Sequence, residues 1–188
     1  PQAGKQVYRF KTTFAGRKIP WRQIEILGNQ TLIALDRVMR DAFDHDQQDH
    51  LSEFTQVISR GKGKKPRKVK FGTINPFEKT TANGLRIAGL GLQTGANLTY
   101  VYDFGDWIEH DVTLEAIAEP VAGVKYPRIA AQNKPQYAPC QDCRRQGRST
   151  NAKWFCVDCS NEQGREVLVC EKCLAKEHED HYANEIVY

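Results

Sequence analysis

The sequence predicts an α+β fold, a mainly antiparallel sheet with one principal helix, followed by a small cysteine-rich domain. Three observations support this prediction. Several segments alternate apolar and polar residues with the period of two that is typical of β-strands, and one segment has the spacing of an amphipathic helix. All six cysteines lie in the last quarter of the 188-residue chain. We therefore expect two domains, residues 1–135 and 136–188.

Two strands are predicted near the N-terminus, over residues 7–14 and 19–27. In the second strand, polar side chains alternate with Ile24 and Ile26, which is the pattern of a strand with one buried face. Gly16 marks the turn between the two strands. We therefore expect the chain to begin with a pair of neighbouring strands.

The principal helix is predicted directly after these strands. Thr31 occupies the place of an N-cap, and the apolar residues that follow it recur at helical spacing up to Phe43. They are Leu32, Leu35, Val38, Met39, Ala42 and Phe43. A helix with this apolar stripe is expected to cover one face of the sheet.

Three further strands are predicted over residues 51–59, 98–104 and 108–118. Gly105-Asp106 forms the turn between the last two, which makes them an antiparallel pair. Residues 84–92 are rich in glycine and favour neither helix nor strand. Residues 120–137 contain three prolines and are predicted to be a linker.

Residues 60–70 form a basic loop with seven Lys and Arg and no acidic residue. Two interpretations remain open, a solvated hairpin loop or a loop that contacts the phosphates of DNA or RNA. No aromatic residue interrupts the run, so base stacking is not indicated there.

The composition favours a soluble, cytoplasmic protein. No apolar run approaches the roughly 18–20 residues that a membrane span needs. The net charge is +4, and it is unevenly distributed: residues 1–135 hold 20 Lys and Arg against 14 Asp and Glu, whereas residues 136–188 hold 7 against 9. The basic character belongs to the first domain, and the acidic second domain is a poor candidate for nucleic-acid binding.

Eight residues of the types that zinc prefers are grouped at the C-terminus as three C-x-x-C pairs and an H-x-x-H. They are Cys140, Cys143, Cys156, Cys159, Cys170, Cys173, His178 and His181. This set predicts two structural zinc ions with four ligands each. Three disulfides or redox-active C-x-x-C pairs are the alternatives, but no signal peptide is visible and the spacing suits a metal better.

The eight ligands can be divided between two ions in two ways. In the interleaved arrangement one ion takes the first and third cysteine pairs, and the other takes the second pair with the histidines. In the sequential arrangement the third pair joins the histidines across only four residues, which leaves little room to enclose an ion. We therefore expect the interleaved arrangement.

Two polar clusters in the first domain offer weaker candidates for catalysis. One is His45, Asp46, Asp49 and His50, and the other is Asp103, Asp106, Glu109, His110 and Asp111. Of these, the candidate catalytic residues are His50, Asp103, Asp106 and His110. If the clusters met in space, their histidines and carboxylates would suit a metal-dependent hydrolase. Asp and Gly are also ordinary turn residues, and His110 alternates with apolar residues, so a purely structural role explains the same pattern.

Several fragments of residues 7–135 together resemble the plasmid pRiA4b ORF-3-like family. They are Ile19-Pro-Trp21-Arg22, Thr31-Leu32, His50-Leu51-x-Glu53-Phe54, Tyr102-Asp-Phe-Gly-Asp106 with Glu109-His110-Asp111, and Tyr126-Pro127-Arg128. The sequence departs from the family where Ile108 replaces the usual tryptophan before Glu109, and where the cysteine-rich region follows. The resemblance implies a compact α+β domain and a plasmid or mobile-element association, but no activity.

The C-terminal region is similar to ZZ-type and B-box zinc fingers, which chiefly bind proteins. Two functions follow as hypotheses. In the first, the protein is a non-enzymatic interaction protein whose finger binds a protein partner and whose residues 60–70 contact DNA or RNA. In the second, it is a metal-dependent hydrolase or nuclease that uses the histidines and aspartates of the first domain. A third, exchangeable metal would favour the second.

Overall fold

The computed structural model describes residues 2–188 and divides the chain into two compact units. The first ends at Asn133 and the second is Lys134–Tyr188. No helix within residues 2–188 has the length and apolar character needed to cross a membrane.

The first unit is built on a seven-stranded sheet in which every neighbouring pair of strands is antiparallel, with the order β4-β3-β5-β6-β1-β2-β7. The strands are β1 Val7–Phe14, β2 Trp21–Leu27, β3 Ser52–Ile58, β4 Arg67–Ile74, β5 Asn97–Tyr102, β6 Ile108–Ala118 and β7 Arg128–Gln132. This architecture confirms the predicted α+β fold with a mainly antiparallel sheet.

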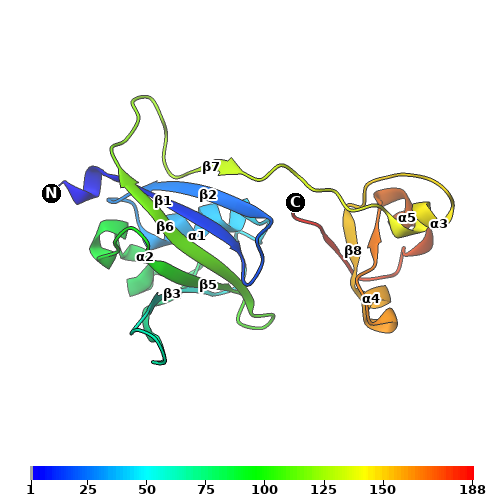
Figure 1. The fold of residues 1–188 in the computed structure, drawn as a ribbon, viewed down its shortest axis with the longest axis horizontal. Helices are drawn as coiled ribbons and strands as arrows, with labels where there is room; N and C mark the ends of the chain where they lie inside the picture. The colour runs from blue at the N-terminus through cyan, green and yellow to red at the C-terminus, as the bar shows by residue number, and fades with distance from the viewer. Residues whose placement is uncertain (1) are drawn as a thin grey trace. The chain divides into compact units, whose positions relative to one another are not determined.

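One helix, α1 (Leu32–Ala42), lies against the sheet, behind it in the view of Figure 1. Leu32, Leu35 and Met39 are fully buried on its inner face, as the helical spacing predicts. Thr31 is at the N-cap position, but its side chain makes no capping hydrogen bond. Burial of the apolar stripe therefore accounts for the helix better than its cap does.

Two predicted irregular segments contain strands. Arg67–Lys70, assigned to the basic loop, begin β4, which pairs with β3 at one edge of the sheet. Residues 128–132, assigned to the linker, form β7 at the other edge and pair with β2. Edge strands commonly carry lysine, arginine and proline, which discourage pairing with other molecules. In β4, Lys68 and Lys70 do alternate with Val69 and Phe71, but the surrounding run of basic residues favoured a loop. The strand β7 is short and has no alternating pattern.

The segment left unassigned, residues 84–92, continues from a short helix, α2 (Thr81–Gly84), into a 3₁₀ turn, η2 (Ile87–Leu90). A second 3₁₀ turn, η1 (Ala3–Lys5), precedes β1. Ile87 is fully buried, and the backbone N–H of Leu32 donates to the carbonyl of Leu85. The segment therefore packs beside the start of α1 and closes one end of the core.

A buried arginine ties α1 to the rest of the first unit. Arg40 is fully buried, and its Nε lies 2.8 Å from Oδ2 of Asp36. Asp36 also accepts hydrogen bonds from the hydroxyls of Tyr100 (2.8 Å) and Ser52. Arg40 further donates to three backbone carbonyls, those of Asp46, Asp49 and His50. This network fixes the loop between α1 and β3.

The second unit is a three-stranded sheet with three short helices. The strands, in the order β10-β8-β9, are β8 Trp154–Cys156, β9 Leu168–Val169 and β10 Ala183–Glu185, and the helices are α3 Gln141–Arg145, α4 Val157–Gln163 and α5 Glu171–Glu177. Val167 and Val169 are fully buried, with Trp154 packed beside them. A unit of this size buries little apolar surface, so its core alone contributes little stability.

Candidate metal centres

Each C-x-x-C pair is built in the same way on a short helix. Cys140, Cys156 and Cys170 are the N-cap residues of α3, α4 and α5. The second cysteine of each pair is the third residue of the same helix. An N-cap side chain and the third helical residue lie next to each other at the helix start, so both sulfurs of a pair face the same point. Two intervening residues are therefore the spacing that lets both cysteines of a pair bind the same ion.

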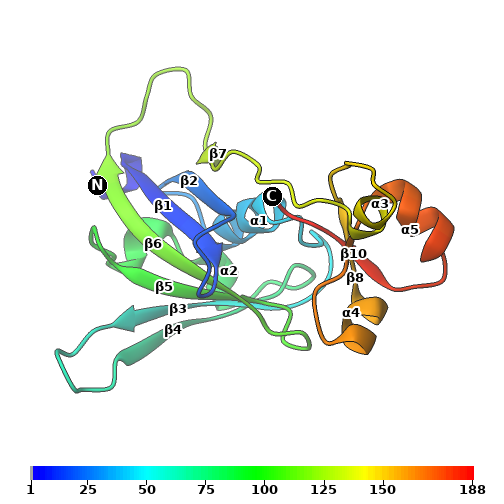
Figure 2. The ribbon, with the colours of Figure 1, turned by 45° about the vertical axis from the view of Figure 1, so that its right-hand side comes forward.

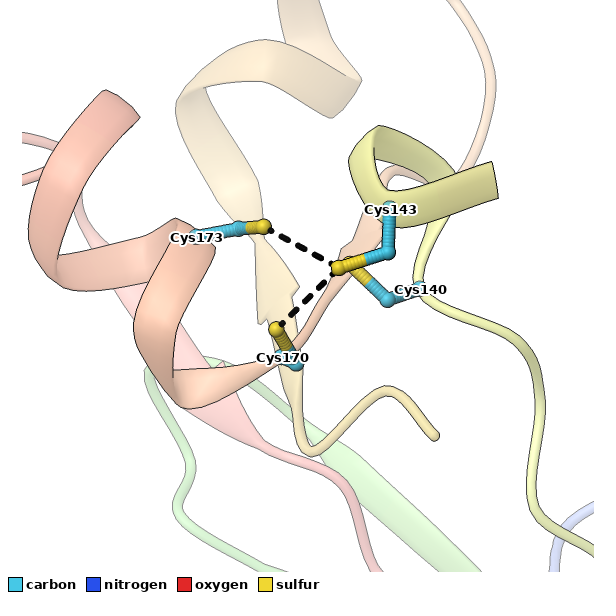
Figure 3. A group of neighbouring side chains, drawn as sticks. All are labelled: Cys140, Cys143, Cys170 and Cys173. Carbon is cyan, nitrogen blue, oxygen red and sulfur yellow. Dashed lines mark hydrogen bonds between the residues drawn. The ribbon is translucent and has the colours of Figure 1, made fainter. Parts of the chain in front are cut away.

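The first ligand group consists of Cys140, Cys143, Cys170 and Cys173, whose sulfurs all lie within 4.8 Å of one another. The sulfur of Cys143 is 3.8 Å from that of Cys170 and 3.5 Å from that of Cys173. Figure 3 shows the sulfurs converging from α3 and from the start of α5. All four cysteines are buried.

The second ligand group consists of Cys156, Cys159, His178 and His181. Both imidazoles point Nδ1 inward, and the two Nδ1 atoms are 3.3 Å apart. The sulfur of Cys159 lies 3.3 Å from Nδ1 of His178 and 3.2 Å from Nδ1 of His181. The structure thus gathers the eight residues into the interleaved groups.

These distances suit tetrahedral metal sites. With Zn–S bonds of about 2.3 Å and Zn–N bonds of about 2.0–2.1 Å, neighbouring sulfurs lie about 3.8 Å apart and neighbouring nitrogens about 3.3 Å apart. The observed separations match both values. All six cysteines are free thiols, and sulfurs 3.5 Å apart are far outside the roughly 2.05 Å of a disulfide. Both groups could therefore hold a metal ion.

The crowding of thiols perturbs their ionisation in opposite directions. Burial and the neighbouring Cys156 raise the pKa of Cys159 to about 11. Burial and the adjacent thiols also raise the pKa of Cys173 well above its usual value. Burial opposes ionisation of Cys170 too, but hydrogen bonds from Cys173 and other neighbours outweigh it and lower the pKa to about 6. Sulfurs this close cannot all ionise unless a cation lies between them.

The polar clusters of the first unit meet only in part. Nδ1 of His50 is 3.2 Å from Oδ2 of Asp103, and Nε2 of His45 is 2.8 Å from Nε2 of His110. The ring of Tyr102 separates these pairs, stacked on His45 and edge-on to His50. Outside the second unit, the described residues form no group of three metal-ligating side chains within 4.8 Å. The hydrolase hypothesis gains no support from this geometry.

The remaining candidate aspartates have turn roles. Asp103 has a positive φ of 54°, and its Oδ1 accepts the backbone N–H of Gly105 at 2.8 Å. Asp106 follows in the same exposed turn and is not brought to either histidine pair. The positions of both residues fit the structural interpretation that the sequence allowed.

The buried histidine pair predicts a loss of stability in acid. Burial, with the charge of Arg40, lowers the pKa of His45 to about 4, and burial, with His45, lowers that of His110 to about 3. Unfolded histidines bind protons below about pH 6.5. Below about pH 6.5 these two histidines therefore bind protons in the unfolded state but stay neutral in the folded state. The free energy of unfolding falls as a result, from about pH 6.5 down to about pH 4. Each histidine contributes a slope of up to about 1.4 kcal/mol per pH unit.

Denaturant titrations between pH 7 and 4.5 measure this effect. A Trp154→Phe background leaves Trp21 and Trp107, both in the first unit, as the fluorescent reporters. His45→Gln combined with His110→Gln is expected to lower stability at pH 7 but to flatten the slope. An unchanged slope in this variant would assign the acid sensitivity to other groups.

Two features of the molecule were not foreseen from the sequence. One is the Arg40 network, and the other is Asp142, whose Oδ2 lies 2.9 Å from Nε2 of His178. Asp142 stands between two cysteines of a C-x-x-C pair, so its position was visible. Its partner, 36 residues away, becomes evident only once the two ligand groups interleave.

The chain is similar to one protein family and to a solved structure. A family model described as plasmid pRiA4b ORF-3-like protein matches residues 6–167, well past the end expected near residue 135 and into the second unit. The crystal structure of a protein of unknown function from Methanosarcina mazei Go1 is 26% identical, with 68% of each chain covered and a TM-score of 0.50. No curated protein matches the sequence.

Proposed function

The chain belongs to the family of plasmid pRiA4b ORF-3-like proteins, and we propose that it is a zinc-binding, non-enzymatic interaction protein. The observation that carries the proposal is the convergence of eight ligand atoms into two groups of four. Four protein ligands complete a tetrahedral site and leave no position for a substrate or a reactive water. The metal in such a site stabilises a fold and performs no chemistry.

Zinc is proposed as the metal because of the donor set. Four thiolates in one group, and two thiolates with two imidazoles in the other, are typical of structural zinc sites. Magnesium, calcium and manganese prefer oxygen ligands. We therefore assign Cys140, Cys143, Cys170 and Cys173 to one zinc ion, and Cys156, Cys159, His178 and His181 to a second.

The second unit is proposed to bind a protein partner, as its resemblance to ZZ and B-box fingers implies. Residues 136–188 hold 7 Lys and Arg against 9 Asp and Glu, and six thiolates with two Zn²⁺ ions would bring their net charge to about −4, which disfavours nucleic acid. An open, largely apolar groove is lined by Tyr137, Ala152 and Lys153 together with Glu171 and Lys172. Tyr137 is 56% exposed, so a large aromatic side chain is available for contact at this groove.

The first unit is proposed to contact the phosphates of DNA or RNA through the β3–β4 hairpin. Figure 2 shows this hairpin extending beyond the neighbouring strands, since β5 ends its pairing with β3 at Val57. All seven Lys and Arg side chains of residues 60–70 belong to exposed residues. Among residues 2–188, only Lys70 of this set forms an ion pair, with Glu53 at 2.9 Å. The other six are available for phosphates.

The nucleic-acid proposal predicts a salt-dependent affinity. Binding of duplex DNA should weaken with a slope of log K against log salt of about −0.9 for each phosphate neutralised. Changing Lys64, Lys65, Arg67 and Lys68 to alanine should reduce the magnitude of that slope by up to about 3.6 and weaken all sequences alike. Fluorescence anisotropy at several salt concentrations measures both effects.

A matched control carries the same change of charge elsewhere on the first unit. Arg17, Lys18, Lys79 and Lys125 are also exposed, and their alanine variant should retain the original slope. Equal losses in both variants would indicate a nonspecific effect of net charge. Absence of binding at about 50 mM salt, a permissive condition, would leave protein interaction as the only proposed role.

A further inference from the structure

We propose that Asp142 positions the imidazole of His178 for metal binding, and that this contact makes the two ligand groups bind metal cooperatively. The inference rests on the proposed function, because it requires a metal in each group. It concerns a residue that lies in neither set of ligands.

Asp142 is a buried carboxylate in a constrained position. It is the second residue of α3 (Gln141–Arg145) and is 4% exposed. Its Oδ2 lies 2.9 Å from Nε2 of His178, and its Oδ1 lies 3.3 Å from Nη2 of Arg145. A carboxylate this buried is costly without partners, so the two contacts account for its location.

The contact with Asp142 selects one tautomer of His178. When Nε2 donates its proton to the carboxylate, Nδ1 carries a lone pair. Nδ1 is the atom that faces the second group, 3.3 Å from the sulfur of Cys159 and 3.3 Å from Nδ1 of His181. Carboxylates that hold metal-binding histidines in this way typically contribute 10–100-fold to metal affinity.

The two helices that meet at this contact both carry ligands of the first group. Asp142 adjoins Cys143 on α3, and His178 is the C-cap of α5, which begins at Cys170 and contains Cys173. A metal in the four-cysteine group therefore fixes α3 against α5, and with them the separation of Asp142 from His178. The second group is thereby organised before its own metal arrives. By thermodynamic linkage, metal in the second group strengthens binding in the first by the same factor.

The neighbouring pair of cysteines provides an internal comparison. Cys156-Val-Asp-Cys159 repeats the Cys140-Gln-Asp-Cys143 pattern. The carboxylate of Asp158, however, accepts the backbone N–H of Tyr182 at 2.8 Å and contacts a loop. The proposed positioning role of Asp142 therefore depends on its contact with His178. An aspartate between two cysteines of a C-x-x-C pair does not have this role by its position in the sequence alone.

Metal titration of the full chain tests the proposal. Metal-free protein is titrated with Co²⁺, whose absorption bands differ between four-sulfur and two-sulfur, two-nitrogen sites, and Zn²⁺ affinities are measured against a competing chelator. In the original protein the two spectral signatures should grow together. Asp142→Ala should lower the affinity of the cysteine–histidine group 10–100-fold, and the four-sulfur signature should then appear first. Asp142→Asn retains an acceptor for Nε2–H and should restore part of the affinity.

One control variant and a count of the bound metals distinguish the outcomes. Glu171→Ala removes a carboxylate from the first turn of α5, where the side chain is 74% exposed, and should leave both affinities unchanged. Two bound metals in the original protein with unchanged affinities in Asp142→Ala would overturn this inference alone, as would weakening of the four-cysteine group without weakening of the cysteine–histidine group. Fewer than two metals in the original protein would overturn the inference together with the proposed function.

Discussion

Removal of zinc by a chelator is expected to unfold residues 134–188 and to leave residues 2–133 folded. Structural zinc contributes roughly 10–16 kcal/mol in isolated finger peptides, mostly as folding energy. The second unit has a small apolar core around Val167 and Val169 and cannot offset that loss. The first unit has its own core, with Phe10, Ile24 and Tyr100 fully buried.

Amide NMR spectra recorded during titration with chelator measure this directly. Peaks of the second unit should collapse toward unfolded positions while those of the first unit stay in place. Readdition of Zn²⁺ should restore them. As a control, changing Cys140 and Cys143 to serine should produce the same pattern without chelator. Loss of both sets of peaks in one step would mean that the two units share a single cooperative fold.

Replacement of Arg40 by methionine is expected to destabilise the first unit by about 3–5 kcal/mol. The change leaves the buried carboxylate of Asp36 without its cationic partner, which lies 2.8 Å away. It also removes the donors to the carbonyls of Asp46, Asp49 and His50. Methionine replaces the aliphatic stem of the arginine but not its guanidinium group, so the loss combines the polar network with the space that the group filled.

Denaturant titration of the variant gives the free energy of unfolding. Arg37→Met is the matched control, because Arg37 is on the same helix but is exposed, and its effect should stay within about 0.5 kcal/mol. Asp36→Asn combined with Arg40→Met should cost less than the sum of the two single changes, since the partners are in contact. Strict additivity would contradict the proposed coupling.

The sequence predicted the elements whose residues carry a periodic signal. Helix α1 was predicted from the spacing of Leu32, Leu35 and Met39, and all three are fully buried. Edge strands β4 and β7 were missed because the basic run that includes the start of β4 favoured a loop, and the prolines on either side of β7 favoured a linker. Whether such an edge segment forms a strand depends on the neighbouring strands with which it pairs more than on its own sequence.

The residues of the candidate metal centres were visible in the sequence because the ligand types and their spacing follow from metal geometry. The polar contacts that hold such side chains in place could not be predicted from the sequence. The contact of Asp142 with His178 spans 36 residues, and the contacts of Asp36 with Ser52 and Tyr100 span 16 and 64. Polar contacts of this kind form only in the completed fold, so they cannot be predicted from a local sequence pattern.

Counting the metal ions bound per chain shows whether the protein holds two closed zinc sites. Native mass spectrometry of protein purified without added metal, combined with elemental analysis, gives both the number and the identity of the ions. We expect two Zn²⁺ per chain and six cysteines that become reactive to alkylation only after chelation. One ion per chain, another metal, or a mass that reveals disulfides would contradict this expectation.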